Sequence, residues 1–213
     1  MPYVAKQPLD QARKARACLR EDEIILAAET CFQTDGFHGA AMSQIAKTAG
    51  ISVGQIYRHF PSKDDLIAKI VERDLERTLA LVEAAFATGD DKIDTLVAQV
   101  GPAIVRAADL ARGRMMLEIV AEASRNPSVS AALQAVDLAG RQRFRIMLAA
   151  VNGPGCDANE IEARVEVLAL LIEGLPWRLV RNPHLNLETF TAHLRQVVRG
   201  LLVVGHAATP PRG

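Results

Sequence analysis

Apolar residues recur three and four positions apart along almost the whole chain, the spacing that places them on one face of an α-helix. The pattern is first clear at Ile24, Ile25, Ala28 and Phe32, and Asp35-Gly36 ends it. No segment shows the alternation of apolar and polar residues that marks a half-buried strand. The sequence therefore predicts an all-α fold of about nine helices, three of them in an N-terminal head and the rest in a larger body.

Two short helices joined by a tight turn are predicted between Ser43 and Lys63. Gly50 suits the left-handed position that ends a helix, because it has no Cβ to clash there. Ser52 can accept a hydrogen bond from a backbone N–H at the start of the second helix. Small or apolar residues that would let the helices cross are Ile45, Ala46, Ala49, Ile51 and Ile56. This arrangement is typical of a helix-turn-helix, whose second helix enters the DNA major groove, although a generic helical hairpin would share it.

The remaining helices are indicated by their capping signals. Ser62 and Asp65 form a capping-box pattern that opens a long helix ending near Gly89, and this helix would couple the head to the body. Gly101-Pro102 should kink or split the next apolar stripe. Three later helices are predicted at Pro127 to about Ala150, Ile161 to about Val180 after the Asp157/Glu160 capping-box pattern, and Leu187 to Val204.

Composition excludes several classes of protein. The 213 residues are 49% hydrophobic with a formal net charge of +0, so any attraction to DNA must come from local patches. Cys18, Cys31 and Cys156 are scattered and odd in number, which favours a reduced, cytoplasmic protein over a disulfide or zinc scaffold and leaves a redox-sensing cysteine as a minor alternative. We find no long apolar run or signal-peptide pattern, so we expect no membrane association.

Catalytic and metal-binding motifs are not found. HExxH, GxSxG and P-loop patterns are missing, and the five histidines are dispersed. We therefore expect no enzyme activity, no cofactor and no metal site.

Residues Ile45 to Leu66 read I-A-x-x-A-G-I-S-x-G-x-x-Y-x-H-F-x-x-K-x-x-L, which resembles the signature of the TetR family of bacterial transcriptional regulators. Ile25 to Phe37 is similar to the first helix of that family and the glycine turn after it. The match covers about the first third of the chain. It implies an all-α regulator with an N-terminal helix-turn-helix and a body that binds a ligand and dimerises. Ala40-Ala41 departs from the family, which often has a threonine before the second helix.

The expected organisation has four parts. Residues 1–20 form a basic arm, which could contact phosphates or be a solvated tail. Residues 21–66 form the DNA-binding domain, residues 67–205 the ligand-binding and dimerisation domain, and residues 206–213 a flexible tail.

Residues near the start of a recognition helix normally reach base edges. The candidates here are Val53, Gly54, Gln55 and Arg58. Glutamine can form a bidentate pair with adenine and arginine with guanine.

Phosphate contacts are predicted for Ser43, Lys47, Tyr57, His59 and Lys63. The family resemblance implies the roles of Tyr57, His59 and Lys63, although His59 could instead be a buried structural histidine.

The resemblance also implies a small-molecule effector inside the body. The candidate lining residues are Met115, Met116, Glu118, Ile119, Glu122, Phe144, Met147, Glu173 and Trp177. Methionine and aromatic side chains suit an adaptable apolar pocket, although each of these residues could simply be core. The methionines and glutamates favour a neutral or weakly cationic, largely apolar ligand.

The last two helices carry more apolar surface than one small body easily buries. By resemblance they would form a twofold dimer interface, with candidate residues Val165, Leu168, Ile172, Leu175, Leu179, Leu194, Val198 and Leu201. The sequence thus favours a repressor that binds a palindromic double-stranded DNA operator as a homodimer and is released by a small molecule. An activator, or a DNA-binding structural or assembly factor without an inducer, are the alternatives.

Overall fold

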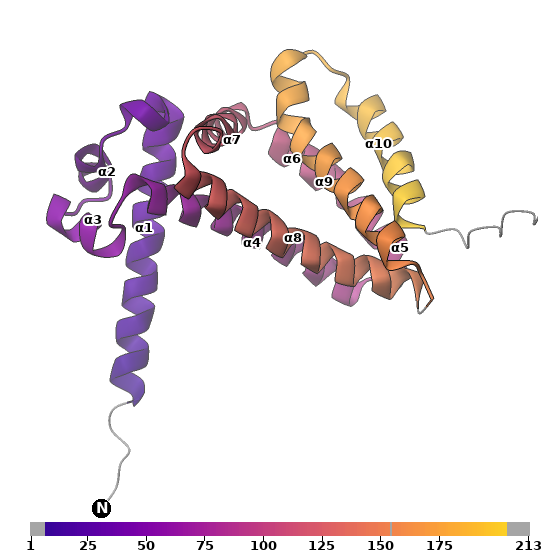
Figure 1. The fold of residues 1–213 in the computed structure, drawn as a ribbon, viewed down its shortest axis with the longest axis horizontal. Coiled ribbons are helices and arrows are strands. Elements are labelled where there is room, and N and C mark those ends of the chain that lie inside the picture. The colour runs from indigo at the N-terminus through magenta and orange to yellow at the C-terminus, as the bar shows by residue number, and fades with distance from the viewer. Residues whose placement is uncertain (1–6, 154, 204–213) are drawn as a thin grey trace, which may run out of the picture. The chain divides into compact units, whose positions relative to one another are not determined.

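The computed structural model describes residues 7–153 and 155–203, with side chains from Cys18 onward. Within these residues the chain forms ten α-helices and no strand, which confirms the predicted all-α class (Figure 1). The helices are α1 Gln7–Gly39, α2 Met42–Thr48, α3 Val53–His59, α4 Lys63–Thr88, α5 Lys92–Ala98, α6 Val100–Ala107, α7 Leu110–Ala123, α8 Pro127–Asn152, α9 Ala158–Arg181 and α10 Leu187–Leu202. None of these helices combines the length and the apolar character that crossing a membrane requires.

The chain divides into two compact units. Unit 1 contains the residues up to Arg73 together with Met115–Ala132, and unit 2 contains Asp74–Arg114 together with the residues from Leu133 onward. The division falls within α4, α7 and α8, so a segment predicted to belong to the body, residues 115–132, groups with the head instead.

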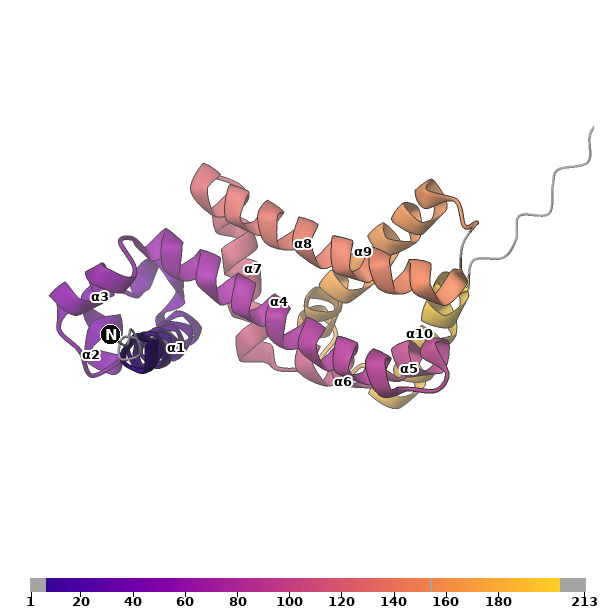
Figure 2. The same cartoon turned by 90° about the horizontal axis from the view of Figure 1, so that it is seen from below.

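Unit 1 is built on the predicted apolar positions. Ile24, Ile25, Phe32, Ile45 and Ile56 are almost wholly buried, so α1, α2 and α3 share one core. Figure 1 shows α2 lying between α1 and α3, and Figure 2 shows the same three helices grouped together. Gly36 kinks the last part of α1 before the chain enters α2, and its φ of 72° is a conformation that side chains disfavour.

The first helix is longer than the sequence pattern indicates. α1 begins at Gln7, so most of the predicted basic arm of residues 1–20 has a helical backbone. Residues 1–6 lie outside the described residues, as does the predicted tail of residues 206–213. The role of the arm on phosphates stays a prediction.

Unit 2 contains the break that Gly101-Pro102 predicts, but the break lies earlier, at Gln99 between α5 and α6. A helix passing through this point would need the N–H of residue 102 to bond the carbonyl of Ala98. Proline has no N–H, and its ring clashes with the carbonyl four residues before it. The helix therefore ends at Ala98, and Pro102 lies in the first turn of α6, where it is tolerated.

Two apolar clusters form the core of unit 2. One packs α4, α5, α8, α9 and the end of α10 around residues such as Val82, Leu148 and Leu168. The other packs α6, α9 and α10 around Ile104, Leu175 and Leu194.

Candidate DNA-binding surface and ligand cavity

The turn between α2 and α3 has the geometry of a helix-turn-helix. Gly50 has a φ of 67°, and its N–H donates to the Lys47 carbonyl at 3.1 Å. The Ile51 N–H donates to the Ala46 carbonyl at 3.0 Å, which completes a Schellman motif at the end of α2. Ser52 caps α3, and its Oγ accepts from the Gln55 N–H at 3.3 Å. The predicted roles of Gly50 and Ser52 are both confirmed.

α3 presents one face to the core and the other to solvent. Ile56 is wholly buried, whereas Val53, Gly54, Gln55, Tyr57 and Arg58 are exposed. No atom outside the local backbone lies within 4 Å of the position a Gly54 Cβ would take, so nothing in the protein blocks close approach at that point. All four candidate base-reading residues therefore reach the surface.

Gln55 has a second function that the sequence analysis missed. Its Oε1 accepts from the Ser52 N–H at 2.9 Å and from the Ser52 Oγ at 3.1 Å, the reciprocal half of a capping box. A bidentate pair with adenine needs this oxygen as well as the amide nitrogen. Gln55 can thus form the predicted pair with adenine only if its Oε1 no longer accepts the hydrogen bonds from Ser52.

The phosphate candidates lie in different environments. Ser43, Lys47 and Tyr57 are exposed on α2 and α3. The His59 side chain is only 26% exposed, and its Nδ1 lies 3.7 Å from the Glu21 carboxylate. His59 therefore has a partner within unit 1 and is not wholly buried.

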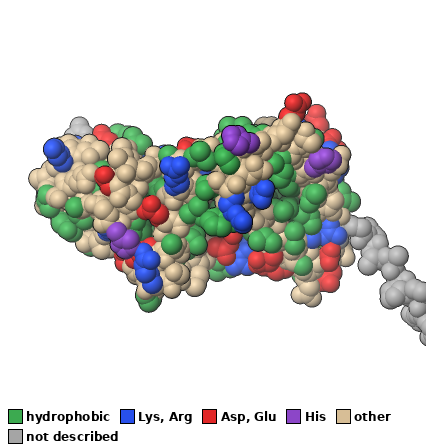
Figure 3. Space-filling view, turned by 90° about the horizontal axis from the view of Figure 1, so that it is seen from above, with side chains coloured by type: hydrophobic (Ala, Val, Ile, Leu, Met, Phe, Trp, Pro, Cys, Tyr) green, Lys and Arg blue, Asp and Glu red, His purple; other side chains and the backbone are tan. Residues whose placement is uncertain are grey.

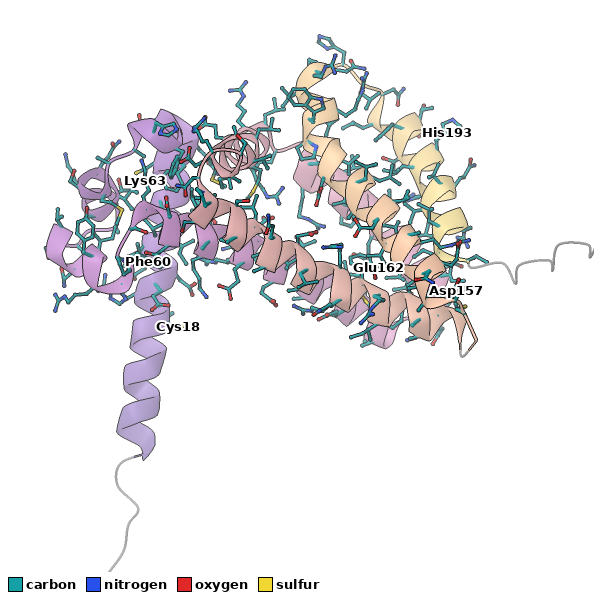
Figure 4. All side chains as sticks on the ribbon, in the orientation of Figure 1. Cys18, Phe60, Lys63, Asp157, Glu162 and His193 are labelled. Carbon is teal, nitrogen blue, oxygen red and sulfur yellow. The ribbon has the colours of Figure 1, made fainter. Side chains whose placement is uncertain are left out.

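Lys63 points into unit 1 instead of outward (Figure 4). Its ammonium donates to the Phe37 carbonyl at 2.5 Å and to the Ala40 carbonyl at 3.1 Å, and it lies 4.3 Å from the centre of the Phe37 ring. Desolvation lowers the pKa of Lys63, although Glu122 and Asp64 oppose this shift. Lys63 therefore has its partners at the end of α1 in this structure, and its phosphate contact stays a prediction.

A cavity of about 80 Å³ lies within unit 2. Its walls come from α4, α5, α6, α8, α9 and α10, and most of the lining is apolar. The lining residues are Thr78, Val82, Leu96, Gln99, Val100, Ala103, Arg106, Phe144, Leu168, Leu171, Ile172, Leu175, Leu194, Val198 and Leu202.

Comparison with known proteins places this geometry in a family. The family model described as bacterial regulatory proteins, tetR family, matches residues 24–70, which span α1 from Ile24, all of α2 and α3, and the start of α4. Residues 24–70 therefore carry the DNA-binding region of the TetR family.

Two similar curated proteins are described as a transcriptional regulator and a transcriptional repressor. The HTH-type transcriptional regulator UidR of Escherichia coli strain K12 is 39% identical over 113 residues, which cover 52% of this chain and 55% of UidR. The chain therefore matches about half the length of that curated relative. The HTH-type transcriptional repressor AcnR of Corynebacterium jeikeium is 29% identical over 166 residues, or 76% of this chain and 82% of AcnR. The solved structure of GusR from Salmonella enterica has a TM-score of 0.68 and 29% identity, covering 86% of this chain and 95% of GusR.

The predicted ligand residues do not form one pocket. Phe144 is the one member of the predicted set that lines the cavity. Met115 and Ile119 are buried in unit 1, Met116 is half-buried there, and Met147 belongs to the core of unit 2.

Glu118 and Glu122 accept hydrogen bonds from other residues of unit 1. The Glu118 carboxylate accepts from the Phe37 N–H at 2.6 Å. Glu122 accepts from Arg125 at 2.8 Å and from Asn126 at 3.3 Å, and it lies 3.2 Å from His38. Burial would raise the pKa of Glu122, but the hydrogen bonds from Asn126 and Arg125 outweigh it and the pKa is lowered. Both carboxylates of α7 therefore contact the end of α1. The helical pattern of α7 alone could not indicate these contacts.

Glu173 and Trp177 lie on the exposed part of α9. Desolvation and the nearby Asp137 and Glu166 raise the pKa of Glu173, while Arg141 opposes them. The Trp177 ring lies 5.7 Å from the Arg181 guanidinium. Neither side chain lines the cavity.

Five predicted dimer residues are core residues of unit 2. They are at most 9% exposed: Val165, Leu168, Leu175, Leu179 and Leu194. Val198 and Leu201 are half-buried against the same core, and Ile172 is 43% exposed. These five residues pack inside the protomer, and the spacing alone does not say which side of α9 or α10 packs there. The dimer role of the set stays a prediction.

The other apolar face of α9 and α10 remains exposed. Val167, Leu170 and Trp177 are spaced three and seven residues apart on α9, and Leu170 is 68% exposed. Val197 is 51% exposed on α10. The space-filling view also shows hydrophobic side chains reaching the surface between charged ones (Figure 3).

The sequence analysis missed Arg106 at the cavity. It follows Val100 and Ala103 at intervals of three residues, so it continues their apolar stripe. A charged residue at an otherwise apolar helical position was the signal that could have identified Arg106 from the sequence.

Proposed function

We propose that this chain is a transcriptional repressor that binds a palindromic DNA operator as a homodimer and releases it when a small molecule binds unit 2. The capped helix-turn-helix carries the proposal, because α3 is anchored by Ile56 while its opposite face is exposed. The description of AcnR as a repressor supports the direction of control.

On DNA, α3 would lie in the major groove with Val53, Gly54 and Arg58 at the base edges. The Arg58 Nε donates to the Gly54 carbonyl at 3.3 Å, which leaves the two terminal nitrogens to pair with guanine. Ser43, Lys47 and Tyr57 would contact phosphates. Because the formal net charge of the chain is +0, the electrostatic attraction to DNA would come from local positive charges such as Lys47 and Arg58.

The dimer would use the exposed face of α9 and α10, here called the outer face and defined by Val167, Leu170, Trp177 and Val197. Large apolar side chains grouped on one helix face are typical of an interface between subunits. A twofold axis through this face would bring two α3 helices to one operator, as a palindrome requires.

The effector would occupy the cavity of unit 2. α4 contributes Thr78 and Val82 to its lining, and the first turn of the same helix carries Lys63, which holds the end of α1. A ligand that prefers one position of α4 must change DNA affinity reciprocally if α4 also positions the helix-turn-helix.

The test is genome-wide footprinting of the purified protein on fragments of its own genome at stated salt concentrations. We expect a palindromic site near a neighbouring gene, and we expect Arg58→Ala to weaken specific binding by about 1–3 kcal/mol. Arg145→Ala, an exposed residue of α8, is the matched control and should leave binding unchanged. Diffuse, salt-sensitive binding without a specific site would refute the proposal.

A further inference from the structure

The cavity of unit 2 has a single ionisable group in its lining. Thr78, Gln99 and Arg106 are the polar members of an otherwise apolar wall, and only Arg106 carries a charge. A guanidinium beside an apolar space is unfavourable unless an anion or water satisfies it. This arrangement therefore restricts what the cavity can bind.

No side chain among the described residues pairs with Arg106. The acid that acts on it electrostatically is Asp74, and both oxygens of that carboxylate bind Arg112 instead. Arg112 is itself a nearby positive charge. Desolvation and Arg112 together lower the pKa of Arg106, and Asp74 only partly opposes them.

The guanidinium nevertheless remains accessible. Among the residues that the structure describes, no fully buried side-chain nitrogen or oxygen lacks a hydrogen-bond partner. The unpaired N–H groups of Arg106 must therefore face open space, and Arg106 is a lining residue of the cavity.

We propose that the cavity binds a small, mostly apolar anion whose planar carboxylate pairs with Arg106. This inference rests on the proposed effector role of the cavity and specifies the chemical class of the ligand. A carboxylate matches the two parallel N–H groups of a guanidinium, and the leucine, valine and phenylalanine walls accept an apolar body.

The size of the cavity limits that body. A volume of about 80 Å³ is well below the roughly 300–1,000 Å³ of common ligand pockets. A single ring or a short branched chain exceeds this volume by far less than a long acyl chain does, so it would need only a small widening of the cavity. The ligand class differs from the neutral or weakly cationic one that the sequence favours, because the glutamates behind that expectation do not line the cavity.

The experiment is calorimetric titration of the full chain, without DNA, with carboxylates and their neutral or cationic counterparts. The probes are benzoate, phenylacetate and 3-methylbutanoate, compared with benzamide, phenylacetamide, 3-methylbutanamide and benzylamine. We expect at least one carboxylate to bind about tenfold to a hundredfold more tightly than its amide, the range for a hydrogen bond to a charged group. Benzylamine should not bind detectably.

Three variants locate the site. Arg106→Met should remove the preference for the carboxylate while leaving weak binding of the amide. Arg145→Met, the same change on an exposed arginine of α8, should behave as the wild type. Ala103→Leu adds volume to the cavity wall and should abolish binding of every probe.

Equal affinity for a carboxylate and its amide would overturn the proposal, as would full carboxylate binding by Arg106→Met. Failure of every carboxylate to bind the wild type at millimolar concentration would also overturn it. Because no DNA is present, these results are independent of operator binding. A carboxylate that binds through Arg106 but leaves footprints unchanged would support the ligand class and refute its role as an inducer.

Discussion

Replacing Lys63 separates the two roles that sequence and structure give to this residue. Lys63→Met keeps the aliphatic stem but removes the ammonium, which donates to the Phe37 and Ala40 carbonyls and lies over the Phe37 ring. Hydrogen bonds from charged donors are worth about 1.5–3 kcal/mol each, and an exposed cation–π contact about 0.5–1 kcal/mol. Lys63 is only half-buried, so solvent replaces part of this energy, and we expect a net loss of about 2 kcal/mol.

For a chain of this size, about 2 kcal/mol corresponds to a fall in Tm of roughly 4–8 °C. The assay is thermal unfolding followed by circular dichroism, together with hydrogen exchange at the end of α1, where the loss should be concentrated. Lys47→Met is the control, since Lys47 is exposed on α2. It should keep the Tm but lower the salt dependence of operator binding by about 1.8, because a homodimer loses one phosphate contact of about 0.9 from each protomer.

The opposite outcome would refute this reasoning. If Lys63→Met kept the wild-type Tm and instead lowered the salt slope by about 1.8, that is about 0.9 for each protomer of the dimer, Lys63 would be a phosphate contact in solution. The structural role given to its ammonium would then be wrong.

Two further predictions concern the proposed dimer and the carboxylate inside unit 1. Leu170→Glu should shift the chain toward monomer in sedimentation analysis, whereas Ile146→Glu, a similarly exposed residue of α8, should not; equal behaviour of the two variants would exclude the outer face. The pKa of Glu122 is lowered from 4.5 in the folded state, so its ionised form stabilises unit 1 fully above about pH 4.5, and this contribution disappears as the pH falls through the folded pKa. The difference in urea midpoint between the wild type and Glu122→Gln should therefore shrink below pH 4.5, and a difference that stays constant with pH would contradict the assignment.

The features that could be predicted from the sequence are those with local causes. Ser52 caps the helix that follows it, and Ser62 and Asp65 form the predicted capping box, with the Ser62 N–H donating to Asp65 at 2.9 Å. Gly50 has the left-handed conformation, and the residues next to it in the sequence are enough to predict this. Each of these features depends on residues within three or four positions, so the order of residues contains the necessary information.

The features that could not be predicted depend on residues far apart in the chain. Glu118 reaches the backbone of Phe37 across 81 positions, and Lys63 reaches the same residue across 26. Neither spacing follows a helical period, so the sequence could not indicate these contacts. It predicts a ligand role for Glu118 and a DNA role for Lys63 instead. The burial of five candidate dimer residues could not be predicted for a related reason, because choosing between the two faces of α9 requires knowing what packs against each.

The capping box of α3 has a consequence for how binding specificity could change over evolution. Gln55 holds the start of α3 through Ser52 and also lies on the face that would meet the bases. A substitution at Gln55 that altered base preference would also remove half of the cap, so it would carry a stability cost. Val53 is exposed and contributes no side-chain cap, and Arg58 makes only one 3.3 Å contact, with the Gly54 carbonyl. New operator preferences should therefore arise more readily by substitution at Val53 and Arg58. Gln55 should be retained because it caps α3.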